Sequence, residues 1–425
     1  MEMTDDVRFE VKGAEPPAGD FLRCRRMTVG PWVNQPEEYE GYNGFVGWAG
    51  ITRLRSGRWG LTFSSGYWHA SVPWTDEIKQ DPDKRRQFEE WHKIGLPDIR
   101  APRGGRAHIM YSDDEGLHWT KPETLVDTLQ DDRHPSILEA ADGTWLCTFF
   151  TYALPKQVQG WHMHSTDAGK TWSEPEKFSD EAQGFGNGPA ILLKDGTILC
   201  SVGGRERAGG AGDLLVFQSK DNGRSFNLIS RINSEEGAQS SESSLTELPD
   251  GRIILISRRK GPVRWSEDQG KTWSQPKYFG VDIYDPHFVM MPSGVLACFH
   301  GSYNTGGLRV FLSPDCGVTW RGPAIQKGCL DKPGGMGYAV DTSVYGYSHA
   351  MLLPDGTVYI VYLHTGGHTP HDARTQAIWG LRVGVSPRAD GIEILPAPGS
   401  AADVKSGDWK DKLQFTGGDP KLGNL

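Results

Sequence analysis

The sequence contains no apolar segment that approaches the roughly 18 residues a transmembrane helix requires. Its first residues, MEMTDDVRFEVKG, are acidic and lack the apolar centre of a secretory signal peptide. We therefore expect no membrane span, and either a cytoplasmic protein or a chain whose leader has been removed.

Positive charge is also scarce. Lys and Arg total 45 against 54 for Asp and Glu, which gives a formal net charge of −9 at pH 7. The basic residues are scattered, apart from a short cluster at 258–260. Proteins that bind nucleic acid or anionic membranes usually concentrate basic residues on one surface. We therefore predict neither partner.

The six cysteines do not form the spacing of a disulfide framework. Cys147, Cys200 and Cys298 each follow a turn pair by the same interval, in three different repeats. Equivalent positions of different repeats lie far apart, so we expect small core residues with reduced thiols and no catalytic cysteine. The histidine pairs at 162 and 164 and at 368 and 371 lack a third ligand, so we expect no metal and no other cofactor.

One short motif, S-x-D-x-G-x-x-W, recurs along the chain. Aspartate satisfies the amides of a tight turn, glycine supplies the positive φ, and the aromatic residue packs between sheets. Four copies are complete: Ser112-Asp114-Gly116-Trp119, Ser165-Asp167-Gly169-Trp172, Ser266-Asp268-Gly270-Trp273 and Ser313-Asp315-Gly317-Trp320. A fifth copy, Ser219-Asp221-Gly223-Phe226, carries Phe, and a degenerate sixth lies around Ser386, Asp390 and Gly391.

A second pattern lies between these motifs: an apolar run, a turn pair ending in glycine, and another apolar run. It occurs six times, for example as AILLKDGTILCSV and HAMLLPDGTVYIVYLH. Such repetition predicts four-stranded blades around a central axis. We therefore predict an all-β fold, a six-bladed β-propeller forming a single domain over residues 1–425.

The composition changes at 69–104, where SVPWTDEIKQDPDKRRQFEEWHKIG has a helical pattern. We interpret this segment as a short helical insertion in blade one. It forms either a lid or rim over one end of the channel, or a solvated surface helix.

Six equivalent positions identify the side chains that we expect to face the channel. The innermost strands of a propeller surround its axis, and the position eight residues before each turn pair lies near the start of such a strand. Ordinary blades would carry small or apolar residues there. The residues at this position are Trp48, His134, Asn187, Glu242, Asp285 and Tyr347.

The S-x-D-x-G-x-x-W motif resembles the Asp-box, or BNR, repeat of the sialidase (neuraminidase) superfamily. GYSHAMLLPDGTVYIVY resembles the sialidase segment that carries the nucleophilic tyrosine, which falls on Tyr347. SSESSLTELPDGRIILISR resembles the segment that carries the activating glutamate and a carboxylate-binding arginine, which fall on Glu242 and Arg258. The resemblance implies that the Asp-box aspartates are markers of the fold and not catalysts.

This assignment is chemically coherent. A phenol has an unperturbed pKa near 10 and needs a base to act as a nucleophile. Sialidases are an exception to the two-carboxylate scheme of retaining glycosidases. A neutral tyrosine also approaches a carboxylate-bearing anomeric carbon without the repulsion an anionic nucleophile would meet. The hypothesis is that Tyr347 attacks, Glu242 assists, and Arg258 steadies an anionic or polar substituent.

The sequence departs from the sialidase pattern at the other arginines. The family binds its substrate carboxylate with three, whereas the segment at 47–51 holds no arginine and Arg309 is out of register. Without them the charge-assisted recognition of a carboxylate is weaker. A new anion site remains possible from other basic residues: Arg100, Arg103, Arg106, Arg205 and Arg207.

The general acid/base is open between three residues. Asp98 lies in the corresponding region of blade one, while Asp285 and His134 occupy channel positions. Histidine has a suitable unperturbed pKa, and Asp285 would need burial to raise its own. Several aromatic residues are candidates for stacking on a sugar ring: Trp48, Trp68, Trp74 and Tyr303.

The leading interpretation is a sialidase-like exo-glycosidase that removes a terminal sugar, either acidic or neutral, from a glycan or polysaccharide. An alternative is a polysaccharide lyase or another glycosidase with His134 or His287 as the base, since propellers support unrelated reactions. A further alternative is a non-catalytic propeller that binds glycans or proteins. Among the substrate-binding residues we place Arg258, Trp48, Asn187, His287 and Arg205.

Overall fold

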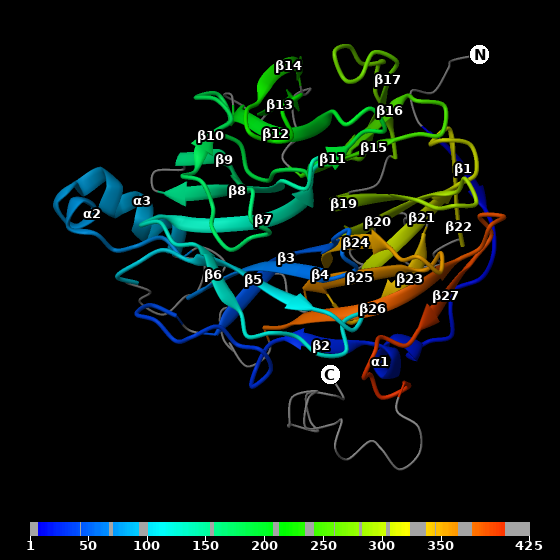
Figure 1. Ribbon diagram of the computed structural model, residues 1–425, viewed down its shortest axis with the longest axis horizontal. Helices are drawn as coiled ribbons and strands as arrows, with labels where there is room; N and C mark the ends of the chain where they lie inside the picture. Colours follow the sequence, from blue (N-terminus) through cyan, green and yellow to red (C-terminus); the bar gives the residue numbers. More distant parts are fainter. Residues whose placement is uncertain are drawn as a thin grey trace.

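The computed structural model describes most of the chain. The described ranges are 7–42, 44–67, 71–92, 101–153, 157–206, 212–233, 242–258, 260–279, 283–302, 307–323, 337–344, 346–363 and 376–403. Within them the protein is almost entirely β-structure, arranged as six sheets in chain order around a centre (Figure 1). The prediction of an all-β, six-bladed propeller is confirmed.

The first three blades each contain four strands that pair with their sequence neighbours. Blade one consists of β3 (Phe45–Arg53), β4 (Trp59–Gly66), β5 (Arg106–Ser112) and β6 (Glu123–Val126). Blade two consists of β7 (Asp131–Glu139), β8 (Trp145–Ala153), β9 (Gln157–Ser165) and β10 (Glu176–Lys177). Blade three consists of β11 (Ile191–Leu192), β12 (Ile198–Glu206), β13 (Gly212–Ser219) and β14 (Asn227–Ile232).

The last three blades follow the same plan, and two of them recruit further strands. Blade four consists of β15 (Ser243–Glu247), β16 (Ile253–Ser257), β17 (Pro262–Ser266) and β18 (Lys277–Tyr278). Blade five contains β19 (Ile283–Met290), β20 (Leu296–Ser302), β21 (Leu308–Ser313), β22 (Thr319–Gly322) and β23 (Tyr338–Asp341). Blade six contains β24 (Gly346–Leu352), β25 (Val358–Leu363), β26 (Ile378–Val385) and β27 (Ile392–Leu395).

The N-terminal segment closes the ring. β2 (Arg26–Val29) pairs antiparallel with β26 and so joins blade six, although the two strands are far apart in sequence. β1 (Arg8–Val11) pairs parallel with β22 of blade five, and the short helix α1 (Asp20–Cys24) lies between β1 and β2. These pairings fix the beginning of the chain to its last two blades.

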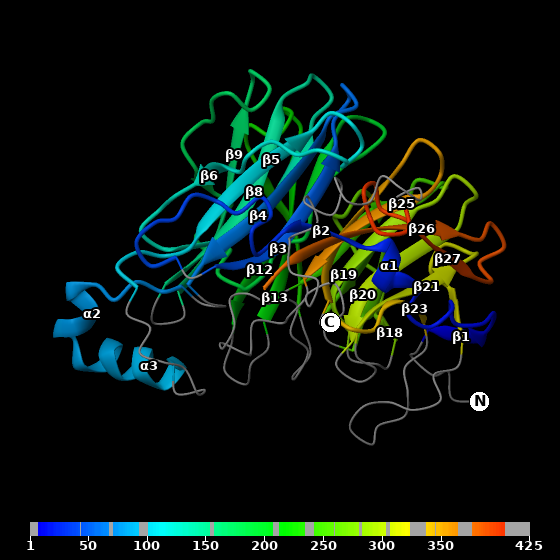
Figure 2. The same ribbon diagram turned by 90° about the horizontal axis from the view of Figure 1, so that it is seen from below.

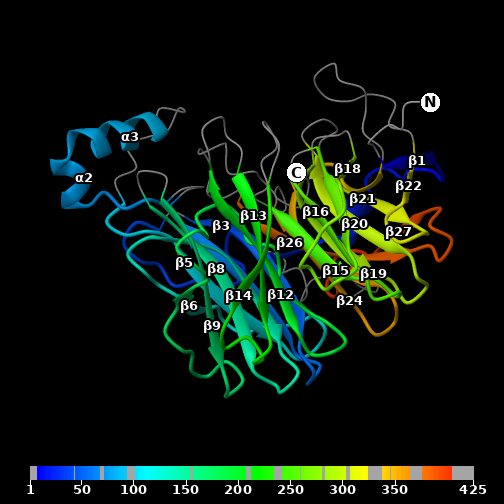
Figure 3. The ribbon, with the colours of Figure 1, turned by 90° about the horizontal axis from the view of Figure 1, so that it is seen from above.

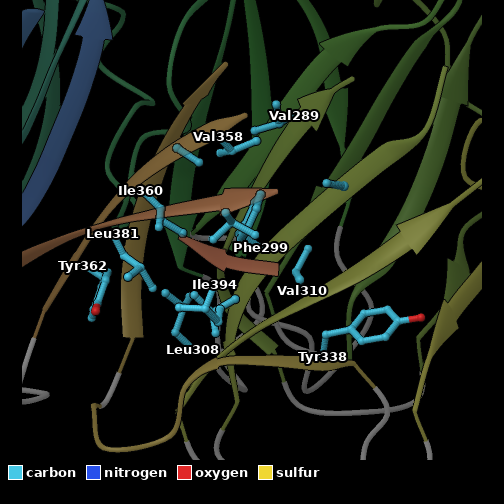
Figure 4. Packing of buried hydrophobic residues seen from close by; sticks show 14 of the residues in the cluster. Val289, Phe299, Leu308, Val310, Tyr338, Val358, Ile360, Tyr362, Leu381 and Ile394 are labelled. Atoms are coloured by element: carbon cyan, nitrogen blue, oxygen red, sulfur yellow. The ribbon is translucent and has the colours of Figure 1, made fainter. Parts of the chain in front are cut away.

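The core lies between neighbouring blades. Figure 4 shows this packing between blades five and six, where Phe299 and Val310 from one sheet face Ile360 and Leu381 from the other. The predicted core position of Cys147, Cys200 and Cys298 is confirmed, because all three are fully buried in middle strands of different blades. No helix of the described ranges is long and apolar enough to cross a membrane.

The Asp-box motifs form the turns between the third and fourth strands. In the fourth copy along the chain, the Ser266 hydroxyl donates to Asp268, and Asp268 accepts from the Thr272 amide at 2.8 Å and the Thr272 hydroxyl at 2.6 Å. The Gly270 amide donates to the Ser266 hydroxyl at 2.8 Å. This end of each blade is opposite to the end where the inner strands begin, so the Asp boxes mark the fold and lie away from the channel mouth.

The connection between β4 and β5 holds the predicted helical insertion. It contains α2 (Asp76–Gln80) and α3 (Pro82–His92), which project beside blade one in Figures 2 and 3. Ile78 and Phe88 are buried in a cluster with Phe150 and Tyr152 of blade two. Because β4 runs antiparallel to β3, this connection lies at the end of the propeller where the inner strands begin.

Candidate functional site

Four of the six predicted channel residues share an unusual backbone conformation. Trp48, His134, Asp285 and Tyr347 all have positive φ, between 45° and 55°. At each of them the pairing register between the first and second strand of the blade shifts, as expected of a β-bulge. The bulge re-aims these side chains at the start of the inner strand.

This conformation is costly for residues other than glycine. A non-glycine residue in the left-handed region costs about 1–3 kcal/mol, and such residues concentrate at functional sites. The cost recurs at equivalent positions of blades one, two, five and six. Strain at four equivalent positions around one axis therefore supports the hypothesis that this end of the channel is the functional site.

Arg258 connects the candidate nucleophile with the candidate base. Its Nη1 donates to Glu242 Oε1 at 2.7 Å and to Tyr347 Oη at 3.3 Å. All three side chains are largely buried, with Glu242 and Tyr347 each only 7% exposed. The guanidinium is thus placed to stabilise negative charge that develops on the phenol oxygen.

Asp285 lies next to Glu242 and Arg258. Its backbone amide donates to Glu242 Oε2 at 2.8 Å, which fixes the second carboxylate oxygen of Glu242. Burial, followed by the nearby charge of Glu242, raises the pKa of the Asp285 carboxyl well above its usual value, although Arg258 acts in the opposite direction. This environment favours the protonated form of the Asp285 carboxyl.

His134 and Trp48 form an uncharged wall of the site. Their rings lie 5.7 Å apart, and the His134 ring meets that of Tyr347 edge-on at 6.2 Å. Burial, followed by the positive charge of Arg133, lowers the pKa of His134 to about 3. The imidazole is consequently neutral near pH 7.

A buried ion pair supports this wall, and the sequence interpretation missed it. Arg133 Nε donates to Asp131 at 2.6 Å, and its guanidinium lies 4.7 Å from the centre of the Trp48 ring. Asp131 also accepts from the Ser71 amide at 3.0 Å, which connects it with the segment that leads into α2. Arg133 directly precedes a channel residue, so its sequence position was a usable signal.

A small cavity of about 30 Å³ lies where the inner strands converge. Its lining includes three of the bulge residues, Trp48, His134 and Asp285. The cavity is completed by residues at and after the aligned positions: Ala49, Gly50, Pro135, Ser136, Asn187, Pro189, Pro286, His287, Ser348 and His349. The structure therefore brings Asn187 and His287 together with the predicted catalytic residues.

The other basic candidates lie elsewhere. Arg205 is exposed at the end of β12. Arg309 binds Glu15 at 3.0 Å and the carbonyl of Gly337 at 2.9 Å, which holds it within blade five. Arg103 and Arg106 both pair with Asp127 in blade one.

Some candidates have other roles or fall outside the description. Trp74 packs against Phe88 with ring centres 4.7 Å apart, as part of the cluster beneath the insertion. Among the described residues, no group of three or more His, Cys, Asp or Glu side chains is arranged to hold a metal ion. Several predicted candidates lie outside the described residues: Trp68, Asp98, Arg100, Arg207, Tyr303, His368 and His371.

Comparison with known proteins identifies the family. Residues 107–360 match the model of the BNR repeat-like domain, which spans more than half of the chain. A protein named sialidase from Bacteroides fragilis (strain YCH46) is 26% identical over 329 residues, covering 67% of this chain and 53% of that protein. The chain thus belongs to the BNR repeat-like family of sialidase-like propellers, and it spans about half the length of this relative.

Solved structures agree on the fold. A protein of unknown function from Dyadobacter fermentans DSM 18053 has a TM-score of 0.61 at 18% identity, covering 87% of this chain and 99% of that one. Hadza microbial sialidase Hz136 has a TM-score of 0.53 at 16% identity, covering 80% of this chain and 67% of that one. At these identities the likeness supports the propeller and not a particular substrate.

Proposed function

We propose that this protein is a glycoside hydrolase of the sialidase type, which releases a terminal sugar from a glycan with retention of configuration. The observation that carries this proposal is the contact of Arg258 with both Tyr347 and Glu242. A guanidinium that contacts both a phenol and a carboxylate brings together the groups that a tyrosine nucleophile requires. Membership of the BNR repeat-like family adds support.

In the first step the Tyr347 oxygen attacks the anomeric carbon and its proton passes to the Glu242 carboxylate. Arg258 stabilises the charge that develops on the phenol oxygen, 3.3 Å from its Nη1. Because Arg258 is already bound to Glu242 and Tyr347, its main role is with the nucleophile. A substrate carboxylate is consequently not required, and the sugar is acidic or neutral.

Asp285 is the proposed general acid. Its raised pKa keeps the carboxyl protonated, so it donates a proton to the departing glycosidic oxygen. The resulting carboxylate then takes a proton from the water that attacks the tyrosyl–sugar intermediate. The bond between Tyr347 and the sugar breaks, and the phenolate takes back its proton from Glu242. His134 and Trp48 provide a neutral surface beside the reacting ring, with Asn187 and His287 beneath it.

The electrostatics disfavour the lyase alternative. A lyase needs a base that abstracts a proton next to a carboxylate, and burial lowers the pKa of His134 to about 3 and that of His287 to about 4. Imidazoles with such low pKa values are weak bases. A binding-only propeller would have no need to connect Glu242 with Tyr347 and Asp285, two residues that have strained backbones.

The test is release of sugar from a panel of terminal glycosides that includes sialic acid, related nonulosonic acids, uronic acids and deoxy sugars. We expect the wild type to release a reducing sugar from at least one substrate and Tyr347→Phe to release none. An unsaturated product that absorbs in the ultraviolet would identify a lyase. Binding without release would identify a non-catalytic propeller.

A further inference from the structure

The cavity that Asp285 helps to line is bordered by residues with hydrogen-bonding atoms that have no protein partner. They are Asn187 Oδ1, His287 Nδ1, Ser348 Oγ and His349 Nε2, each buried and each on a residue that lines the cavity. Asn187, His287 and Ser348 are themselves at least nine-tenths buried, with exposures of 8%, 8% and 3%. An unsatisfied buried polar atom costs about 1–3 kcal/mol, so four around one cavity indicate a polar occupant.

The other contacts of Asn187 and His349 determine whether their unpartnered atoms donate or accept a hydrogen bond. Asn187 Nδ2 donates to the carbonyl of Phe149 at 2.8 Å, so its Oδ1 can only accept. The Ile51 amide donates to His349 Nδ1 at 3.2 Å, and burial lowers the pKa of His349 well below its usual value. The neutral ring therefore carries its proton on Nε2, which can only donate.

The other two groups can complete the coordination of the occupant. Burial lowers the pKa of His287 to about 4, so its ring is neutral, and the ring also donates to the backbone of Ala350. A neutral imidazole carries one donor and one acceptor nitrogen, so the unpartnered Nδ1 of His287 accepts. A serine hydroxyl donates and accepts. The occupant must thus accept from His349 and donate to Asn187 at the same time. A metal cation cannot accept a hydrogen bond from His349, and a simple anion cannot donate one to Asn187.

The size of the cavity agrees with a single small molecule. Its volume is about 30 Å³. A site needs at least about 10–15 Å³ to hold a water molecule, which then makes about three hydrogen bonds to buried polar groups.

We propose that this cavity is a binding site for one buried water molecule. The water donates to Asn187 Oδ1, accepts from His349 Nε2, and bonds to His287 and Ser348 with its remaining capacity. It thereby joins the inner chain segments of blades three, five and six directly beneath the Asp285 carboxyl. Backbone pairing within each blade does not provide such a connection between blades.

The direct test is a high-resolution crystal structure of the wild type grown with Mn²⁺. We expect one oxygen peak within about 2.7–3.2 Å of Asn187 Oδ1 and His349 Nε2, without anomalous signal. A cavity with no density would overturn the proposal. So would an anomalous peak in it, because that would identify a bound cation.

A pair of variants tests the same point through stability. Ser348→Val fills the cavity with a methyl group, and Ser348→Ala leaves the space for water. If water is bound, Ser348→Val displaces it, leaves Asn187 and His349 unsatisfied, and melts several degrees below Ser348→Ala. A higher melting temperature for Ser348→Val, with no water in the Ser348→Ala crystal structure, would show that the cavity is dry.

Discussion

The carboxylate of Glu242 is held by two neighbours in the candidate site. Glu242 receives Arg258 on one oxygen and the Asp285 amide on the other, so its carboxylate has a fixed orientation. Burial, followed by the charge of the same carboxylate, raises the pKa of Asp285. A pair of carboxyl groups with different protonation states is the usual arrangement for dividing nucleophile activation from acid catalysis.

The first prediction concerns Asp285→Asn. The amide cannot donate its proton to a leaving group, so kcat on a natural glycoside should fall by about 10²–10⁴-fold. The loss should be much smaller on an aryl glycoside with a good leaving group, which departs without protonation. In the wild type, activity should decline as the pH rises through the raised pKa of Asp285, and this decline should be absent in the variant.

The leaving-group comparison contains its own control. Tyr347→Phe should lose activity equally on both kinds of substrate, since the nucleophile serves every leaving group. If Asp285→Asn instead lost the same factor on both substrates, Asp285 would not be the general acid.

Some residues of this site could be predicted from the sequence. Counting eight residues back from each turn pair found Tyr347, Glu242 and Asp285, because the blades repeat and the motif fixes the register. His349 was missed although it lies two residues after Tyr347, as His287 does after Asp285. The count of eight residues selects one position per blade, and the bulge at that position has no sequence signal of its own.

At the scale of the element, the inner strand is the unit that builds the site. Its bulge appears in four blades with the same positive φ, on four chemically different residues. The blade thus supplies a fixed backbone position, and the side chain at that position varies. This explains how one repeat places an indole, an imidazole, a carboxyl and a phenol around one axis.

The Asp box is the corresponding unit at the other end of the blade, and its role is structural. Asp268 accepts bonds from Ser266, Lys271 and Thr272, and the bonds from Thr272 contribute most to lowering its pKa to about 2. Asp268→Ala should therefore lower the free energy of unfolding by about 1 kcal/mol, without changing kcat. Denaturant unfolding and an activity assay measure the two effects.

Glu267→Ala is a suitable control for this change, because Glu267 is the exposed neighbour of Asp268 in the same turn. It should leave both the unfolding free energy and kcat unchanged. A large loss of kcat in Asp268→Ala at full folding would contradict the separation of the Asp box from the site.

The sequence was most informative about these elements where the signal is local. Turn pairs and Asp boxes predicted the blades, and the helical pattern at 69–104 agrees with α2 and α3. The pairing of β1 with β22 and of β2 with β26 was not predicted. These strands are short and pair with partners several hundred residues away, so no local pattern specifies their place.

At the scale of the whole molecule, closure of the ring depends on contacts between the N-terminal segment and the last blades. Arg25 lies between α1 and β2 and forms a fully buried ion pair with Asp341 at 2.9 Å. Asp341, at the end of β23, also accepts from the Tyr362 hydroxyl of blade six at 2.9 Å. The guanidinium of Arg25 stacks 4.2 Å from the Trp379 ring.

Arg25→Met should therefore destabilise the propeller strongly. The change leaves the Asp341 charge buried without its partner, which typically costs about 3–5 kcal/mol. Equilibrium unfolding in denaturant measures this loss. We expect Arg25→Met to be folded at low temperature but to have a clearly lower unfolding midpoint than the wild type.

The matched control is Arg23→Met. Arg23 pairs with Asp20 at 3.1 Å, but its side chain is 67% exposed. Exposed pairs contribute about 0–1 kcal/mol, so this variant should unfold close to the wild type. Equal effects of the two substitutions would show that the buried pair does not stabilise ring closure.

The proposed mechanism depends on a covalent bond between Tyr347 and the sugar. Trapping this intermediate is the most direct test of Tyr347 as the nucleophile. Wild-type protein would be incubated with a fluorinated, activated glycoside of the sugar that it releases, digested, and analysed by peptide mass spectrometry. If Tyr347 is the nucleophile, we expect one fluorosugar adduct on the peptide that contains Tyr347, and none in Tyr347→Phe. An adduct on another residue, or rapid turnover by Tyr347→Phe, would contradict it.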